Sequence, residues 1–247
     1  MRVNIAALFV TVGFIGSVGT VEASNPSQDQ VITNSPLFIA EHPDLKYRLR
    51  GVDAYKKAQF GGAFTNFKRA ARYADKPSQG MLAEMLWKGE GVAADRVQAY
   101  AWIDIAAERE YPAMILSREK MWSQLSEDER KQAVAVSLEL HKYYGDNIAK
   151  NRLEVALRRA KTHVLGSRVG YVGYSHLCLD MTGLEPTDLL VCKDKVDGSD
   201  YYQDKFWKPK DYWQWQDIAW KDPAVGTVSI GKLQAPSEKP APVVPEK

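Results

Sequence analysis

Two apolar helical patterns, separated by a glycine-containing break, constrain the fold of this chain more than any other feature. Three residues share one helix face in the first pattern, at spacings of three and four: Leu82, Met85 and Leu86. The second pattern places five residues on one face: Ala99, Trp102, Ile103, Ala106 and Ala107. Gly89 can end the first helix in a left-handed conformation, and Asp95 can cap the second. The sequence therefore predicts a helical hairpin with helices at 79–88 and 95–109, packed through Leu82, Leu86, Trp102 and Ala106.

The hairpin resembles a known repeat. A unit of about 35 residues cannot bury its apolar face alone and usually belongs to a stacked array. The residues that carry the resemblance are Gly80, Leu82, the run 88–92 with Gly89 and Gly91, Asp95, Ala99, Trp102, Ala106, Ala107 and Ala113. They are similar to a Sel-one-like repeat, a branch of the tetratricopeptide-like α-solenoids, and the resemblance implies an exported bacterial binding or assembly scaffold without catalysis. Glu110 departs from the family pattern, which usually has glycine before the next repeat.

Helical patterns on both sides extend the array. Residues 37–76 carry a weaker repeat with helices at 44–58 and 62–74, although two ordinary amphipathic helices are an alternative. Further helices are predicted at 114–121, 127–144 and 147–164. Ser126 and Glu129 form a capping box at the start of the second of these. We therefore expect a mainly α protein, with a short α-solenoid of helix hairpins at 37–164.

The residue pattern changes near Val164. Glycines alternate with valine and tyrosine up to residue 174, which favours short strands, and 189–191 and 225–233 are further strand candidates. We expect a small β-rich C-terminal module at 165–233, followed by a disordered Pro-rich tail at 234–247.

The chain has two cysteines, Cys178 and Cys192. An exported chain favours a structural disulfide between them, and the turn-forming residues of the intervening stretch would let it fold back as a hairpin. Two buried free thiols and an intermolecular bridge are the alternatives.

The N-terminal segment has the pattern of a signal peptide. Arg2 precedes an uncharged apolar run at 5–21, and Val21 and Ala23 place small residues at a cleavage site. The prediction is a signal peptide at 1–23, a flexible arm at 24–36, and a periplasmic or secreted protein without a stable membrane anchor. An uncleaved membrane anchor is the alternative.

Signals for chemistry are weak. Ser175, His176 and Asp180 are close in sequence, but a nucleophilic triad requires a spatial arrangement. His176, Cys178, Asp180 and Cys192 do not have a standard zinc-site spacing. The 33 basic and 31 acidic residues nearly balance, and no basic block indicates nucleic-acid binding. We predict no catalytic, cofactor or metal site.

An aromatic stretch at 201–220 is the strongest binding candidate outside the repeat. Its candidate binding residues are Trp207, Tyr212, Trp213 and Trp215, because such side chains combine a large contact area with a polar group. A helix starting near Pro209 would place Trp213 and Trp220 on one side; filling a small core is the other interpretation. The leading hypothesis is a non-catalytic scaffold whose concave face binds another protein. One alternative is a cell-wall or glycan-binding protein that uses the 201–220 aromatic residues. The other, third, is an enzyme with a site between the domains.

Overall fold

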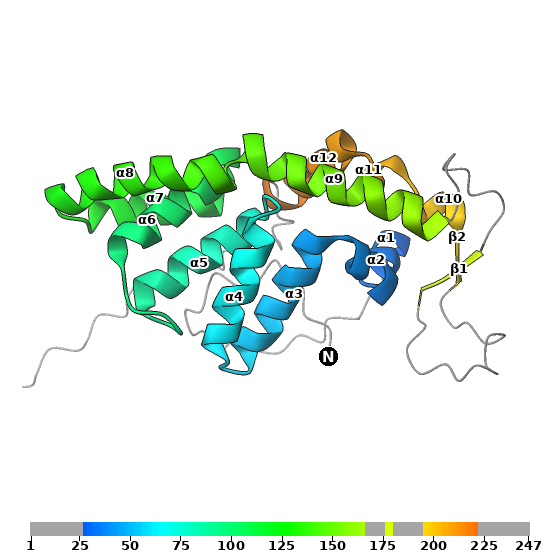
Figure 1. Ribbon diagram of the computed structural model, residues 1–247, viewed down its shortest axis with the longest axis horizontal. Coiled ribbons are helices and arrows are strands. Elements are labelled where there is room, and N and C mark those ends of the chain that lie inside the picture. The colour runs from blue at the N-terminus through cyan, green and yellow to red at the C-terminus, as the bar shows by residue number, and fades with distance from the viewer. Residues whose placement is uncertain (1–26, 166–175, 180–194, 222–247) are drawn as a thin grey trace, which may run out of the picture.

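The computed structural model describes residues 27–165, 176–179 and 195–221, and these residues are mainly helical (Figure 1). Helix α3 (Pro43–Lys56) pairs with α4 (Phe60–Ala71), and α5 (Lys76–Lys88) pairs with α6 (Arg96–Ala106). Because α4 also packs against α5, the two hairpins stack on each other. The predicted fold class, mainly α with stacked helix hairpins, is confirmed.

The same backbone conformation recurs at the two junctions that follow these hairpins. Ala74 and Glu110 lie 36 residues apart, and both adopt a left-handed conformation, with φ of 61° and 58°. Each directly precedes the N-cap residue of the next helix, Asp75 in one case and Tyr111 in the other. The structural period of the array is thus visible in the backbone. Glycine adopts this conformation without a steric penalty, which accounts for the glycine that Sel-one-like repeats usually have where this chain has Glu110.

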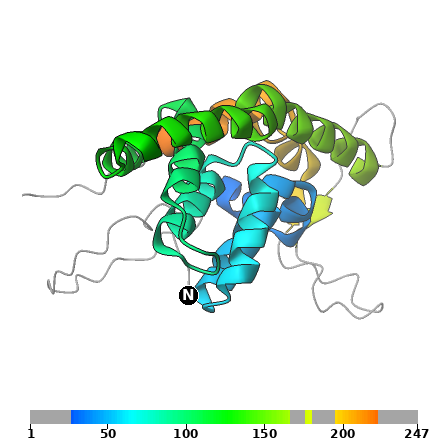
Figure 2. The same cartoon turned by 60° about the vertical axis from the view of Figure 1, so that its left-hand side comes forward.

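Two further helices pack against α6. These are α7 (Pro112–Ser123) and α8 (Glu127–Tyr144); the latter has the predicted bounds and the predicted capping box of Ser126 and Glu129. The 3-10 helix η2 (Ala107–Arg109) continues α6, so helical structure ends at residue 109 as predicted. Figures 1 and 2 show α9 (Asp146–Leu165) following α8 along one side of the molecule and passing over the first hairpins.

The two ends of the described chain meet. Helices α1 (Gln28–Thr33) and α2 (Pro36–Glu41) lie beside α10 (Gly198–Tyr201) and α11 (Asp204–Trp207) (Figure 1). The Gln28 side chain donates to Asp200 at 2.7 Å, and Lys205 pairs with Asp29 at 2.6 Å.

The prediction of a flexible arm at 24–36 is therefore wrong from residue 27 onward. Polar residues that suggested flexibility instead cap α1, because Ser27 and Gln30 form a reciprocal capping box. Ile32 and Phe38 are fully buried and hold α1 and α2 to the rest of the molecule.

The C-terminal region contains a small sheet, but most of its described residues are helical. Strand β1 (His176–Cys178) pairs antiparallel with β2 (Lys195–Asp197), with Leu177 opposite Val196. After β2, residues 198–221 form α10, α11 and α12 (Pro209–Lys221), so a β-rich module is wrong for this stretch. The large aromatic side chains fill the space between helices here, where the sequence interpretation expected strands.

Several predictions concern residues outside the described ranges. They are the signal peptide at 1–23, strand candidates at 166–174, 189–191 and 225–233, the tail at 234–247, and the Cys178–Cys192 bridge, since Cys192 is not among the described residues. These remain predictions.

Candidate binding groove

A groove of about 390 Å³ lies between α4, the end of α5, the loop before α6, and helices α6 and α8. Its apolar lining comes from Phe64, Leu86, Val92, Ala93, Ala94, Trp102, Leu140 and Tyr144. Three polar residues complete the lining: Lys68, Asp95 and Gln98. A hollow of this size is within the range of pockets that bind small molecules or a peptide side chain.

The glycines of the repeat shape one wall of the groove. Gly89 ends α5 with φ of 75° and donates its N–H to the carbonyl of Met85, as the sequence predicts. Gly91 also has a positive φ of 74°, and a β-carbon there would lie 2.5 Å from the carbonyl carbon of Phe60. Only glycine therefore lets the loop approach α4 so closely.

Asp95 fixes the other end of this loop. Its carboxylate accepts the Gln98 backbone N–H at 2.8 Å, which confirms the predicted N-cap. The Gln98 side chain donates to the same carboxylate at 3.0 Å, so the reciprocal half of a capping box is replaced by a contact between side chains. Both oxygens of Asp95 are thus already engaged.

The remaining repeat residues build the floor of the groove. Trp102 is 2% exposed, and its ring centroid lies 4.6 Å from that of Tyr144. The small residues Ala99, Ala106 and Ala107 share one core with Trp102 and Leu82. The motif therefore has mainly a structural role, while Trp102 and Tyr144 also reach the groove surface.

Basic residues gather at one edge of the groove. Phe64, Lys68 and Arg72 occupy successive turns of one face of α4 and its C-cap. Arg152 of α9 reaches the same place, because its guanidinium donates to the backbone carbonyls of Arg72 and Tyr143. Burial raises the pKa of Tyr144, and the charges of Arg72 and Arg152 oppose this increase. We call Lys68, Arg72 and Arg152 the cationic edge.

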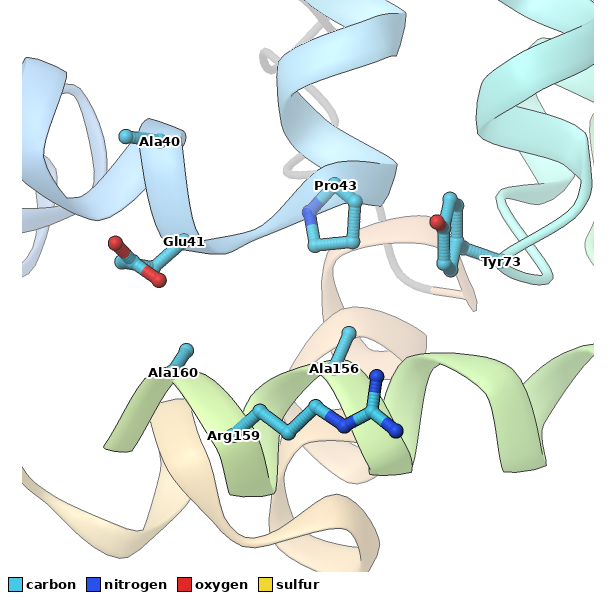
Figure 3. A pocket seen from close by; sticks show the side chains of 7 residues that line it. All are labelled: Ala40, Glu41, Pro43, Tyr73, Ala156, Arg159 and Ala160. Atoms are coloured by element: carbon cyan, nitrogen blue, oxygen red, sulfur yellow. The ribbon is translucent and has the colours of Figure 1, made fainter. Parts of the chain in front are cut away.

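A second hollow, a cleft of about 720 Å³, separates the α2–α3 junction from α9 (Figure 3). It is lined by Ala40, Glu41, Pro43, Tyr73, Ala156, Arg159 and Ala160. Figure 3 shows Glu41 and Arg159 on opposite walls, with the small residues Ala156 and Ala160 on the α9 side. Charges of both signs and few large apolar side chains distinguish this cleft from the groove.

The aromatic stretch belongs to the core. Trp207, Tyr212 and Trp213 are buried, and Trp215 is half-buried against the rings of Phe206 and Tyr212. Of the two interpretations, core packing is the one that the structure shows; as surface binding residues, Trp207, Tyr212 and Trp213 are wrong candidates. The predicted helix from Pro209 is present as α12.

A buried ionic network joins the hairpins to the C-terminal helices, and the sequence interpretation did not find it. Lys76 is completely buried and contacts Glu108 at 2.7 Å and Asp146 at 3.0 Å. Arg109 donates to both oxygens of Asp146, at 2.6 and 3.0 Å, and stacks 4.5 Å from the Trp213 ring centroid. These residues come from four separate elements, so no local spacing predicts their contact.

The protonation states of this network are set by its own contacts. Burial lowers the pKa of Lys76, although Asp146 and Glu108 oppose the change. Burial alone would raise the pKa of Asp146, but the hydrogen bonds from Arg109 and the charge of Lys76 hold it well below its usual range. The charged groups of the network pair with one another, and their contacts hold α5, η2, α9 and α12 together.

Part of the chain matches part of a solved structure. That structure is of a protective antigen present in uropathogenic Escherichia coli strains, which is described as displaying an SLR fold. The two chains are 22% identical, with a TM-score of 0.40, over 45% of this chain and 25% of that one. No family model and no curated protein matches the chain.

The remaining candidates for chemistry do not assemble into a site within the described residues. His176 contacts Asp197 at 2.7 Å across the small sheet, whereas Ser175, Asp180 and Cys192 lie outside the described ranges. Residues 27–165, 176–179 and 195–221 contain no group of three His, Cys, Asp or Glu side chains placed to hold a metal ion. Within the same ranges, no helix is both long and apolar enough to span a bilayer.

Proposed function

We propose that this chain is an exported, non-catalytic scaffold that binds another protein in the groove between α4, α6 and α8. One observation carries the proposal: a stack of helix hairpins holds an open groove with an aromatic floor and a cationic edge. Trp, Tyr and Arg are the residue types that dominate the energetics of protein interfaces. Stacked helical repeats present such extended surfaces to partners.

The lining of the groove favours binding over catalysis. Its titratable residues are Lys68, Asp95 and Tyr144. Asp95 is committed to capping α6, and burial raises the pKa of Tyr144, which keeps the phenol protonated. Among the lining residues there is no Ser, Cys or His that could serve as a nucleophile or a base.

Export is the part of the proposal that rests on the sequence pattern alone. Cleavage after Ala23 would release a chain beginning at Ser24, in the periplasm or outside the cell. N-terminal sequencing of the protein recovered from that compartment tests it. A chain that still begins at Met1 would contradict cleavage.

A cross-linking pull-down from the cell envelope tests the binding function. The variant Ala93→Trp would fill the groove from its exposed loop wall, and Ala135→Trp on the exposed surface of α8 is a matched control outside the lining. We expect the wild type and the control to capture the same protein and Ala93→Trp to lose it, with circular dichroism unchanged. Equal capture by all three would place binding elsewhere, and capture of cell-wall glycan with no protein would favour the glycan-binding alternative.

A further inference from the structure

We infer that the segment bound in the groove is an acidic peptide of the partner, with one large apolar side chain as its anchor. This inference rests on the proposed function and names the class of partner. It follows from the shape of the groove and from the excess of cations at its edge over its one acidic lining residue.

The apolar anchor follows from the floor of the groove. Phe64, Trp102, Leu140 and Tyr144 face a hollow of about 390 Å³. In protein interfaces, a few desolvated anchor side chains in pockets supply most of the binding free energy, and the contacts around them exclude water. A leucine or tryptophan side chain of the partner matches this floor, since the surrounding rim is polar.

The acidic character follows from the cationic edge. Lys68 and Arg72 make no ion pair with any residue that the structure describes, and both are exposed. They are four residues apart, which places them about 6 Å apart along α4. Arg152 is held beside them by two backbone carbonyls.

The one acidic lining residue offsets only part of this charge. Gln98 holds Asp95 at the N-terminus of α6 through a backbone and a side-chain hydrogen bond. Asp95 keeps its negative charge, but it stands against the three cations of the cationic edge, so the groove and its edge are positive on balance. Carboxylates of the partner meet cations whose charge is not yet paired, and complementary charges of this kind fix the choice of partner.

Fluorescence anisotropy with designed peptides tests the inference on the mature full-length chain. The probe is a fluorescein-labelled peptide with central leucine and tryptophan residues flanked by glutamates. Two counterparts replace the glutamates by lysines, or the leucine and tryptophan by serines. We expect the acidic apolar peptide to bind at least about tenfold more tightly than either counterpart, and less tightly at about 300 mM salt than at about 50 mM.

Charge reversal supplies the decisive variant. Lys68→Glu combined with Arg72→Glu should weaken binding of the acidic peptide by about tenfold or more and should improve binding of the basic one. Lys210→Glu, an exposed lysine on α12 outside the groove lining, is the matched control and should leave both affinities unchanged. Circular dichroism of each variant confirms the fold.

Three results would overturn the inference. They are equal affinity for acidic and basic peptides, an affinity that the double variant does not change, and no binding of the acidic peptide up to about 1 mM. The proposed function fails separately: if Ala93→Trp still abolishes capture of a partner while the acidic preference is absent, the binding function stands and only the class of partner is wrong.

Discussion

The hairpin stack and the C-terminal helices at 198–221, which we call the closing segment, are packed by different means. Alanines supply much of the hairpin core, and they let neighbouring helices approach closely around a few large side chains such as Phe67 and Trp102. The closing segment is packed by rings instead: Tyr201, Phe206 and Trp207 surround Phe38.

The two regions also differ in the reach of their contacts. From α3 to α6, each helix packs against the helix that follows it in the chain. In the closing segment, His42 faces the carbonyl of Phe206 across 164 residues, and Tyr212 donates to Asp44 across 168. Helical periodicity predicts which neighbouring helices pack together. Packing between segments more than 160 residues apart depends instead on the shape of each aromatic ring and on buried hydrogen-bond partners.

Removing one tryptophan from each region gives the largest expected effect. Trp207→Ala and Trp102→Ala should each reduce the free energy of unfolding by about 3–5 kcal/mol, because both side chains are buried. The loss should be larger for Trp207, whose Nε1 donates to the Tyr201 carbonyl at 2.7 Å. Urea denaturation measures both, and a loss under about 1 kcal/mol for Trp102 would show that it is poorly buried.

The closing segment should respond to pH through His42. Both ring nitrogens of His42 face carbonyl oxygens, at 2.8 and 3.0 Å, yet burial outweighs these contacts and lowers its pKa to about 4. The pKa of His42 is lower in the folded than in the unfolded protein. The contribution of neutral His42 to the free energy of unfolding is therefore complete above about pH 6.5 and is lost as the pH falls toward 4. The loss is about 3 kcal/mol.

Asp44 has the opposite effect on the free energy of unfolding in the same pH range. Burial and the charge of Asp75 raise the pKa of Asp44 to about 6. The contribution of Asp44 to the free energy of unfolding is therefore complete at low pH and is lost as the pH rises toward 6. The variant Asp44→Asn should therefore show a steeper increase of unfolding free energy between pH 4 and 6.5 than the wild type. NMR titration of His42 completes the measurement, and an imidazole that titrates near 6.5 would contradict the prediction.

The predicted Cys178–Cys192 disulfide would add a covalent constraint beside the closing segment. Cys178 lies opposite Lys195 in the small sheet, three residues beyond Cys192 in sequence. A bridge closing a loop of about 15 residues should stabilise the fold by roughly 3 kcal/mol in the chain-entropy model. Mass spectrometry of non-reduced, alkylated monomer checks it: two alkylated cysteines would refute the bridge.

The smallest expected effect concerns the hairpin junction. Glu110 has a φ of 58°, a conformation that costs non-glycine residues about 1–2 kcal/mol. Glycine removes that cost but increases the entropy of the unfolded chain, so Glu110→Gly should stabilise the protein by about 0.5–1 kcal/mol. The control Glu139→Gly, within α8, should instead destabilise it by about 1 kcal/mol, and a loss at both sites in thermal denaturation would contradict the prediction.

The sequence predicts most of the hairpin stack because its signals are local. Ser126 and Gly145 bracket α8, and Gly89 and Asp95 bracket the turn beside the groove. Helix α1 has a local start signal, the Ser27–Gln30 capping box, but its six residues are too few to show a helical period, and Ile32 is buried against distant elements. Periodicity likewise gives no sign that Lys68, Arg72 and Arg152 would meet, because the last of these is brought in by α9.

Helix α9 limits how this architecture can change in length. It starts beside α8 and contacts α2 and α3 at the other end of the stack, and its 20 residues span about 30 Å. An inserted hairpin would separate these contacts by at least one interhelical spacing of about 8–10 Å, which α9 could not cover. Open solenoids can gain or lose units by duplication and deletion, but here a change in hairpin number would require a matching change in α9. The length of α9 therefore limits the number of hairpins that this fold can contain.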